Sequence, residues 1–168
     1  MEPIACYTDG STDRNGSPDA TGGCGVYFGE ADLRNIARAY DGPELPPTNQ
    51  RCELWAIVLA LRSVSGDVPV VVHTDSKYAL QCVTTWCLNW EKNGWKNARG
   101  RDVANQSIIR EILRLKRERT ADTMLEYVPG HKGVPGNEAA DALANRGRRE
   151  YIYLRREYIS IHSSTKEA

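Results

Sequence analysis

Residues 68–76 read VPVVVHTDS, and this stretch decides the fold class. Residues 68–74 form a nearly continuous apolar run of strand length, which is typical of a central strand buried on both faces. Asp75 and Ser76 follow directly, and either side chain can cap a helix that runs through Leu80 and Val83. A buried strand that leads into a helix predicts an α/β domain, in which helices pack on a sheet.

The chain before this strand predicts three more strands and a helix. The runs at 4–8 (IACYT), 22–29 (GGCGVYFG) and 33–40 (LRNIARAY) favour an antiparallel meander, because turn-forming residues separate the first two. From Thr48 onward apolar residues recur with the helical period, and Gly66 predicts the end of that helix.

The chain after the buried strand predicts a short helix at 85–95 that ends at Gly94, an amphipathic helix at 102–119, a strand at 123–128 and a helix at 137–146 that ends at Gly147. The order β-β-β-α-β-α-α-α-β-α predicts a five-stranded mixed sheet flanked by helices. We expect the first three strands to be antiparallel and the fourth and fifth to run parallel to the first. Residues 1–147 would form the domain, and residues 148–168 a C-terminal extension.

Length and composition fit one soluble domain. The 168 residues carry 22 Lys and Arg against 22 Asp and Glu, so the formal net charge is zero. No apolar run approaches the roughly 20 residues of a membrane helix, and the first residues lack the pattern of a secretory signal. The five cysteines are scattered, which favours reduced thiols in an intracellular protein, cytoplasmic or nuclear.

The charges are unevenly distributed along the chain. Residues 1–50 hold three Arg against eight Asp and Glu, whereas residues 91–119 hold nine Lys and Arg against four Asp and Glu. This split is typical of a molecule with an acidic site and a separate basic surface. A solvated charged helix is the simpler explanation of the basic segment.

Four carboxylates stand where elements begin or end. Asp9 and Asp75 follow the first and fourth strands, and in sheets with parallel strands functional residues gather at the carboxyl ends of those strands. Glu53 and Asp141 lie in the first turns of two helices. Each acid alone is explained as a cap or a turn former. Together, clustered carboxylates repel one another and need a counter-ion, and hard oxygen ligands favour Mg²⁺ or Mn²⁺.

Residues 129–141 read PGHKGVPGNEAAD and allow three interpretations. His131 and Asp141 could belong to a metal site or to a proton relay, or the segment could be a plain turn followed by a capped helix. We expect Asn137 to be the helix cap, and Pro135 with Gly136 to end the loop.

Five motifs then carry a resemblance: YTDGS, TNQRCELWA, HTDSKYAL, NWEKNGWK and PGHKGVPGNEAADALA. In order and spacing they are similar to type 1 ribonuclease H, in particular the cellular stand-alone enzymes, over residues 4–147. The resemblance implies the ribonuclease H-like fold and two Mg²⁺ ions per site, which Mn²⁺ can replace. It places the metal ligands at Asp9, Glu53, Asp75 and Asp141.

The implied activity is endonucleolytic hydrolysis of the RNA strand of an RNA–DNA hybrid, with 5′-phosphate and 3′-hydroxyl ends. One metal ion would activate the attacking water and the other would stabilise the leaving 3′-oxygen. His131 would handle a proton near the leaving group or at product release, since histidine exchanges protons near neutral pH. The hybrid is the expected partner of a monomer that needs no membrane.

The resemblance also implies the contacts with substrate. Groups around Asn15, Asn49 and Gln50 would contact 2′-hydroxyls or minor-groove base edges. Gly10 and Ser11 would let the backbone approach the substrate closely, and Ser76 would be a further substrate contact. Thr48 and Asn105 match a pocket for a DNA phosphate, although Pro46 stands where many eukaryotic relatives carry an arginine. A basic protrusion that grips the DNA strand would use Trp86, Trp90, Lys92, Trp95 and Lys96. The tryptophans could instead only fill a small satellite core.

Two other interpretations of the chain's function remain open at this point. The chain could be the ribonuclease H domain of a retroelement polyprotein, or a hybrid-binding module that no longer cuts. The complete set of four acids argues against the second, because binding alone does not need them. In the extension, REYIYL and REYISI repeat at a seven-residue step, which fits an amphipathic helix or an added strand.

Overall fold

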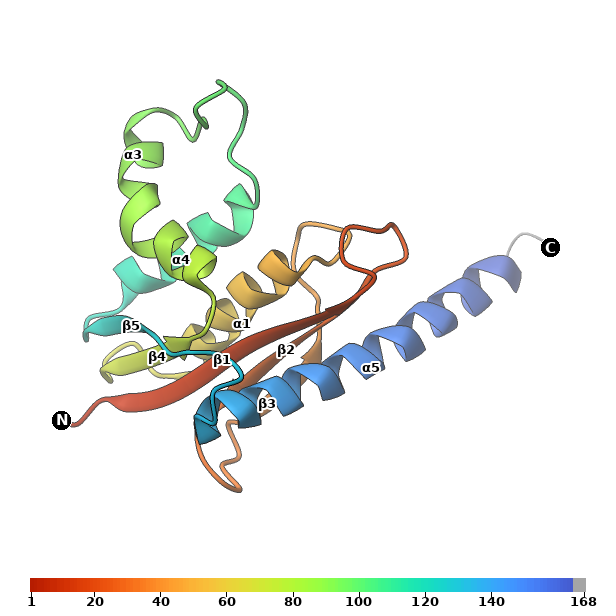
Figure 1. Cartoon of the computed structure of the whole chain (residues 1–168), viewed down its shortest axis with the longest axis horizontal. Helices are drawn as coiled ribbons and strands as arrows, with labels where there is room; N and C mark the ends of the chain where they lie inside the picture. Colours follow the sequence, from red (N-terminus) through yellow and green to blue (C-terminus); the bar gives the residue numbers. More distant parts are fainter. Residues whose placement is uncertain (165–168) are drawn as a thin grey trace.

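The computed structural model describes residues 1–164, apart from the side chains at 153, 155–159 and 162–164. Its elements are β1 (Ile4–Asp13), β2 (Thr21–Tyr27), β3 (Ile36–Ala39), α1 (Asn49–Ser63), β4 (Val70–Thr74), α2 (Lys77–Gln81), the π-helical segment η1 (Cys82–Trp86), α3 (Cys87–Lys92), α4 (Gln106–Glu118), β5 (Thr123–Tyr127) and α5 (Pro135–Ser164). The sheet order is β3-β2-β1-β4-β5 (Figure 1). β1, β2 and β3 are antiparallel, and β4 and β5 run parallel to β1, which confirms the predicted mixed sheet.

Helix α1 is the centre of the core. Its residues from Cys52 to Leu61 are all buried, because one side packs on β1 and β2 and another side packs on α4. A helix that is buried on most of its circumference carries apolar residues on nearly all sides, and the sequence of α1 has this pattern. This burial fixes the position of Glu53, which is the single acid within that buried run.

Helix α5 lies on the opposite face of the sheet from α1 and crosses β1, β2 and β3 (Figure 1). Glycines in β2 permit this close approach. A Cβ atom built on Gly25 would lie 2.2 Å from the carbonyl oxygen of Ala140, and one on Gly23 would lie 2.1 Å from the backbone nitrogen of Arg148. The absence of these side chains therefore sets how near α5 comes to the sheet.

Strand β1 is longer than the sequence predicts. The turn-forming residues after Thr8 were expected to leave the sheet, yet β1 continues to Asp13, which pairs with Thr21 of β2. Pairing with β4 stops at Thr8, opposite Thr74. The hairpin with β2 thus supplies backbone hydrogen bonds that compensate for weak strand propensity in this segment.

Two helix ends also differ from expectation. The helix predicted to stop at Gly147 continues to Ser164, because Gly147 is a packing residue whose Cβ would lie 2.3 Å from the carbonyl oxygen of Arg38. The helix predicted from residue 102 begins at Gln106, since Lys96 and Asp102 form a β-bridge and Asn105 adopts a left-handed backbone conformation. The short helix predicted at 85–95 belongs to one helical run from Lys77 to Lys92, with η1 in its middle.

The extension after residue 147 is therefore helical up to Ser164, and the alternative of an added strand is wrong for that part. Tyr151 packs partly against the core. The last part of the predicted extension, residues 165–168, lies outside the described residues. Within residues 1–164, no helix combines the length and the apolarity that a membrane span requires.

Candidate active site

The parallel pair β1 and β4 brings two carboxylates together. The last pair of its ladder is Thr8 with Thr74, and Asp9 and Asp75 are the residues that follow. The two strands are neighbours in the sheet, and Asp9 lies inside β1, not directly after its end as the sequence predicts. Asp9 is 4% exposed, so its carboxylate is almost wholly removed from bulk water.

Glu53 joins these two acids from the first turns of α1. Thr48 caps that helix, and its Oγ1 accepts a hydrogen bond from the backbone nitrogen of Arg51 at 3.1 Å. A Cβ on Gly10 would lie 2.6 Å from the backbone nitrogen of Glu53, so only glycine lets α1 approach β1 here. One carboxylate oxygen from each of Asp9, Glu53 and Asp75 lies within 4.8 Å of the others.

The environment of this three-carboxylate group disfavours negative charge. Burial raises the pKa of the Asp9 carboxyl to about 7, and the nearby charges of Asp75 and Asp141 act in the same direction. Burial, followed by the charge of Asp9, also raises the pKa of Glu53. The buried Oε2 of Glu53 has no hydrogen-bond partner in the part of the chain that the structure describes. A divalent cation would relieve the repulsion and supply that missing partner.

Asp141 faces the same cavity from the second turn of α5. The cavity has a volume of about 310 Å³ and is lined by Asp9, Gly10, Asn49, Glu53, Asp75, Ser76, Gly130, His131 and Asp141. All four predicted carboxylates are therefore brought together. Asp141 is set slightly apart, because it does not share the 4.8 Å grouping of the other three.

Asn137 contributes to the site in a way the sequence reasoning missed. The prediction that it caps the last helix is wrong, because α5 begins at Pro135, a residue well suited to a first helical turn. Asn137 is 3% exposed, and its Nδ2 donates to Oδ2 of Asp75 at 3.2 Å. Its position one turn before Asp141 on the same helical face was the available signal.

His131 lies at the rim of the cavity on the loop between β5 and α5. Its side chain is exposed and its backbone has a φ of 54°, a left-handed conformation that is uncommon for a residue other than glycine. Gly130 is held tightly, since a Cβ there would lie 2.5 Å from Oδ2 of Asp75. The loop thus places His131 beside the carboxylates, and its role as a proton handler stays a prediction.

A second cavity of about 470 Å³ adjoins the first and shares Asn49 with it. It is lined by Asn15, Thr48, Asn49, Gln50, Arg51, Ala104 and Asn105, which include five residues predicted to contact substrate. Oδ1 of Asn15 accepts a hydrogen bond from the backbone nitrogen of Asn49 at 3.0 Å. Arg51 donates from Nε to Oδ1 of Asn105 at 3.0 Å and from Nη1 to the carbonyl oxygen of Pro46 at 2.7 Å.

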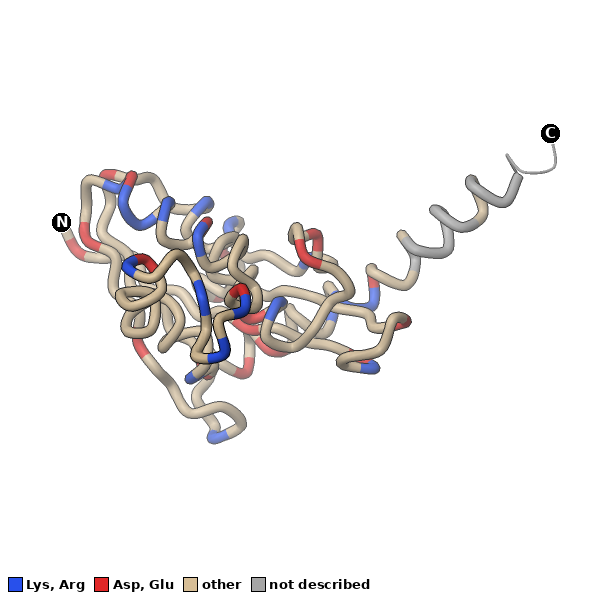
Figure 2. The backbone as a smooth tube through the Cα atoms, turned by 90° about the horizontal axis from the view of Figure 1, so that it is seen from above, with Lys and Arg blue, Asp and Glu red and all other residues tan. Residues whose placement is uncertain are grey.

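The segment from α3 to α4 protrudes from the body (Figure 1), and Figure 2 marks the Lys and Arg positions along the backbone in blue. Lys92, Arg99 and Arg101 of this segment are exposed. Trp86, Trp90 and Trp95 follow one another with ring centroids 6.0 and 5.9 Å apart. Trp95 is buried and Trp86 is 41% exposed, so the aromatic row combines core packing with a free outer surface. Lys92 is exposed, whereas Lys96 forms an ion pair with Asp102.

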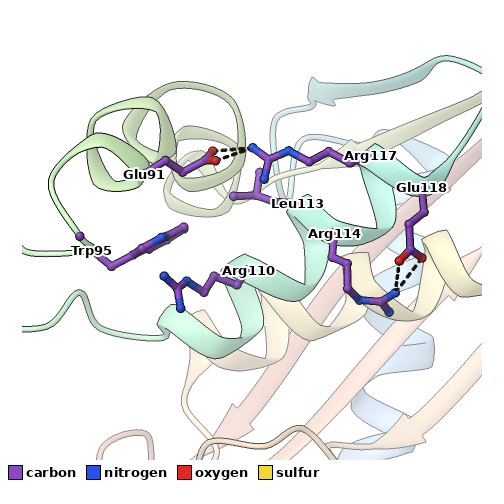
Figure 3. A pocket seen from close by; sticks show the side chains of 8 residues that line it. Glu91, Trp95, Arg110, Leu113, Arg114, Arg117 and Glu118 are labelled. Atoms are coloured by element: carbon purple, nitrogen blue, oxygen red, sulfur yellow. Dashed lines mark hydrogen bonds and ion pairs between the residues drawn. The ribbon is translucent and has the colours of Figure 1, made fainter.

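Contacts with α4 hold this protrusion in place. Figure 3 shows Arg110 lying over the ring of Trp95, at 4.8 Å from its centroid, and Arg117 paired with Glu91 at 2.6 Å. Arg114 is paired with Glu118. Several cations of α4 therefore serve the structure, and the cations that remain for a ligand lie chiefly between Lys92 and Arg101.

Known proteins similar to this chain were found by sequence and by structure. Ribonuclease H of Schizosaccharomyces pombe is 44% identical over 153 residues, which cover 88% of this chain and 56% of that protein. Ribonuclease H of Alcanivorax borkumensis is 37% identical over 147 residues, covering 88% of this chain and 92% of that protein. The chain thus spans little more than half of the first relative and nearly all of the second.

A solved foamy viral protease-reverse transcriptase in complex with RNA/DNA hybrid has a similar fold, with a TM-score of 0.66 and 25% identity. The match covers 88% of this chain and 21% of the viral one. The family model described as RNase H matches residues 1–149, which include all four carboxylates. The motifs, the sheet order and these matches agree, and the chain therefore belongs to the RNase H family, in its type 1 branch.

Proposed function

We propose that this protein is an endonuclease that hydrolyses the RNA strand of RNA–DNA hybrids with the help of divalent metal ions, leaving 5′-phosphate and 3′-hydroxyl ends. The observation that carries the proposal is the group of three carboxylate oxygens, one each from Asp9, Glu53 and Asp75, that lie within 4.8 Å of one another. Within the described residues, the buried Oε2 of Glu53 has no hydrogen-bond partner. A protein that only binds hybrids has no need of such a costly buried cluster.

The protein's own residues would hold the ions. The ligands would be Asp9, Glu53, Asp75 and Asp141. Oxygen ligands of this kind suit Mg²⁺ best, and Mn²⁺ can replace it. Asn137 fixes the carboxylate of Asp75 by its hydrogen bond. Bound divalent ions would activate a water molecule and stabilise the charge that develops on the leaving oxygen. His131, at the rim, would deliver or accept a proton at that leaving group.

The second cavity suits the nucleic-acid backbone. The dipole of α1 favours a phosphate at the helix N-terminus, where the backbone N–H groups of Asn49 and Arg51 already donate to Asn15 and Thr48. Pro46 provides no charge there, but its carbonyl oxygen anchors Arg51, which supplies a guanidinium to the same cavity. In our proposal Thr48, Arg51 and Asn105 hold a DNA phosphate. The RNA strand contacts Gly10, Ser11, Asn15, Asn49, Gln50 and Ser76. The DNA strand is gripped by Trp86, Trp90, Lys92, Trp95 and Lys96.

A panel of labelled substrates tests the proposal. An RNA–DNA hybrid, an RNA duplex, a DNA duplex and single-stranded RNA are incubated with the protein and Mg²⁺. We expect internal cuts in the RNA strand of the hybrid alone, and the products should accept ligation through their 5′-phosphates without prior phosphorylation. Equal cutting of single-stranded RNA, or products with 5′-hydroxyl ends, would contradict it.

The affinity of the site for Mg²⁺ should depend on pH. The pKa of Asp9 is raised to about 7 in the metal-free protein, so below that pH a proton occupies the site and must leave before an ion binds. Competition by one such proton makes binding roughly 10-fold weaker at pH 6 than at pH 8. Calorimetric titration with Mg²⁺ at both pH values measures this. Equal affinities would show that Asp9 is already ionised in the free protein.

Removal of the His131 imidazole should slow turnover. We expect His131→Ala to lower kcat by roughly 100-fold, the lower end for loss of a general acid or base, with KM little changed. Lys132→Ala is the matched control, because Lys132 is the exposed neighbour in the same loop. Rates are measured from pH 6 to 9. If His131→Ala matched the control at every pH, the segment would be a plain turn.

A further inference from the structure

Asn145 joins strand β1 to one of the four carboxylates. It lies on α5 one turn after Asp141, and its side chain contacts Ser11 of β1. Its Oδ1 accepts a hydrogen bond from Oγ of Ser11 at 2.6 Å, and its Nδ2 donates to Oδ2 of Asp141 at 3.4 Å. The side chain thus bridges two elements whose contact residues are 134 positions apart in sequence.

The direction of these hydrogen bonds follows from the charge of Asp141. An ionised carboxylate only accepts hydrogen bonds, so the amide must present its NH₂ group to Asp141 and its oxygen to Ser11. With the amide turned over, its oxygen would face the carboxylate and two acceptors would repel one another. The hydroxyl of Ser11 can donate, and by donating to Oδ1 it stabilises the favourable orientation.

The bridge meets a need that is specific to Asp141. Asp9, Glu53 and Asp75 are grouped tightly, but Asp141 stands outside that group and must be aimed at it. Asp75 has an equivalent support, because the amide of Asn137 donates to one of its oxygens. When one oxygen of a carboxylate is held by an amide, the other oxygen is left in a fixed direction for a cation.

We propose that Asn145 is a positioning residue for Asp141 and that Ser11 is its anchor. This inference rests on the proposed function, since it takes Asp141 to be a metal ligand. Asn145 holds Oδ2 of Asp141, keeps the other oxygen toward the three-carboxylate group, and is itself oriented by Ser11. Ser11 therefore acts on the metal site from β1, in addition to the contact with the RNA strand that we propose for it.

Titration of Mg²⁺ alone into the protein tests whether Asn145 positions Asp141, because it measures metal affinity and needs no cleavage assay. Removing a partner of a metal-binding carboxylate weakens metal affinity by about 10- to 100-fold, and the long contact at 3.4 Å places Asn145→Ala near 10-fold. We expect a smaller loss, roughly threefold, for Ser11→Ala, since it removes only the anchor. Ser11→Thr restores the hydroxyl and should bind Mg²⁺ as the unchanged protein does.

The double variant separates a shared bridge from two independent effects. If Ser11 acts only through Asn145, Ser11→Ala combined with Asn145→Ala binds Mg²⁺ no more weakly than Asn145→Ala alone. Ser17→Ala, in the turn after β1, is the control for loss of a serine hydroxyl. Thermal unfolding of each variant without metal identifies any that is not folded.

Two results would overturn the inference: an Mg²⁺ affinity of Asn145→Ala within twofold of the unchanged protein, or losses from the two single variants that simply multiply. The hybrid-cleavage panel on the unchanged protein is run separately. A failure there would count against the proposed function, whereas the comparison of Mg²⁺ affinities would still decide whether Asn145 positions Asp141.

Discussion

Asp9→Asn is expected to lower the rate of hybrid cleavage by about 1000-fold or more while hybrid affinity stays within about threefold. The substitution keeps the shape of the side chain but removes one charged ligand, and loss of roughly 4 kcal/mol of transition-state stabilisation corresponds to this factor. Binding should persist because Asp9 lines neither the second cavity nor the protrusion. Single-turnover rates and fluorescence anisotropy with a labelled hybrid measure the two quantities.

The same substitution should stabilise the metal-free protein. The pKa of Asp9 lies near 7 in the fold against an ordinary value of 3.8, so the folded state binds this proton more tightly than the unfolded chain. The resulting stability is present at low pH and is lost as pH rises through about 7. At pH 8 the uncharged amide introduced by Asp9→Asn avoids that loss, and we expect a gain on the order of 2 kcal/mol in the free energy of unfolding.

Urea unfolding with a chelator at pH 8 measures this gain. Asp13→Asn is the control, because Asp13 is an exposed acid at the end of the same strand. Normal cleavage by Asp9→Asn would remove Asp9 from the catalytic site. Lower stability than the unchanged protein would instead show that Asp9 is not held in a charged, uncompensated cluster.

Gly25→Ala should damage both the fold and the activity. The added Cβ would lie 2.2 Å from the carbonyl oxygen of Ala140 and 2.6 Å from the backbone nitrogen of Ala144, so α5 must move away from β2. Overpacking of this kind costs about 3 kcal/mol. The same movement displaces Asp141, and a misplacement of about 1 Å lowers a catalytic rate by roughly 100-fold.

Gly66→Ala is the matched control for this experiment. The Cβ that it adds has an ordinary contact of 3.7 Å with Cα of Arg119, so we expect little loss of stability and normal cleavage. Urea unfolding and single-turnover cleavage are measured for both variants. If Gly25→Ala were as stable and as active as Gly66→Ala, close packing of α5 on β2 would not be what positions Asp141.

Much of the site follows from local sequence patterns. The apolar run before Asp75 indicates a buried strand, and if that strand lies beside β1, as the structure shows, Asp9 and Asp75 come together. Glu53 follows from the start of α1 at Asn49. These predictions hold because each depends on one element and its immediate neighbour.

Other features depend on contacts between distant segments, and the sequence patterns do not reveal them. Gly147 looks like a helix stop until Arg38 of β3 is seen against it. Asn137 looks like a cap, yet its amide serves Asp75, which is 62 positions away. Asn145 carries no motif at all, and its importance appears only when Ser11 and Asp141 are found on either side of its amide.

The central claim is that the four-carboxylate site uses divalent ions to cut the RNA strand of a hybrid. Single-turnover cleavage of a hybrid with a labelled RNA strand, followed as Mg²⁺ is added to chelator-treated protein, tests it most directly. We predict no cutting without metal and a rate that rises with more than first-order dependence on Mg²⁺ before it saturates. Hybrid that stays bound and uncut at every Mg²⁺ concentration, or RNA cut equally well in the chelator, would contradict the claim.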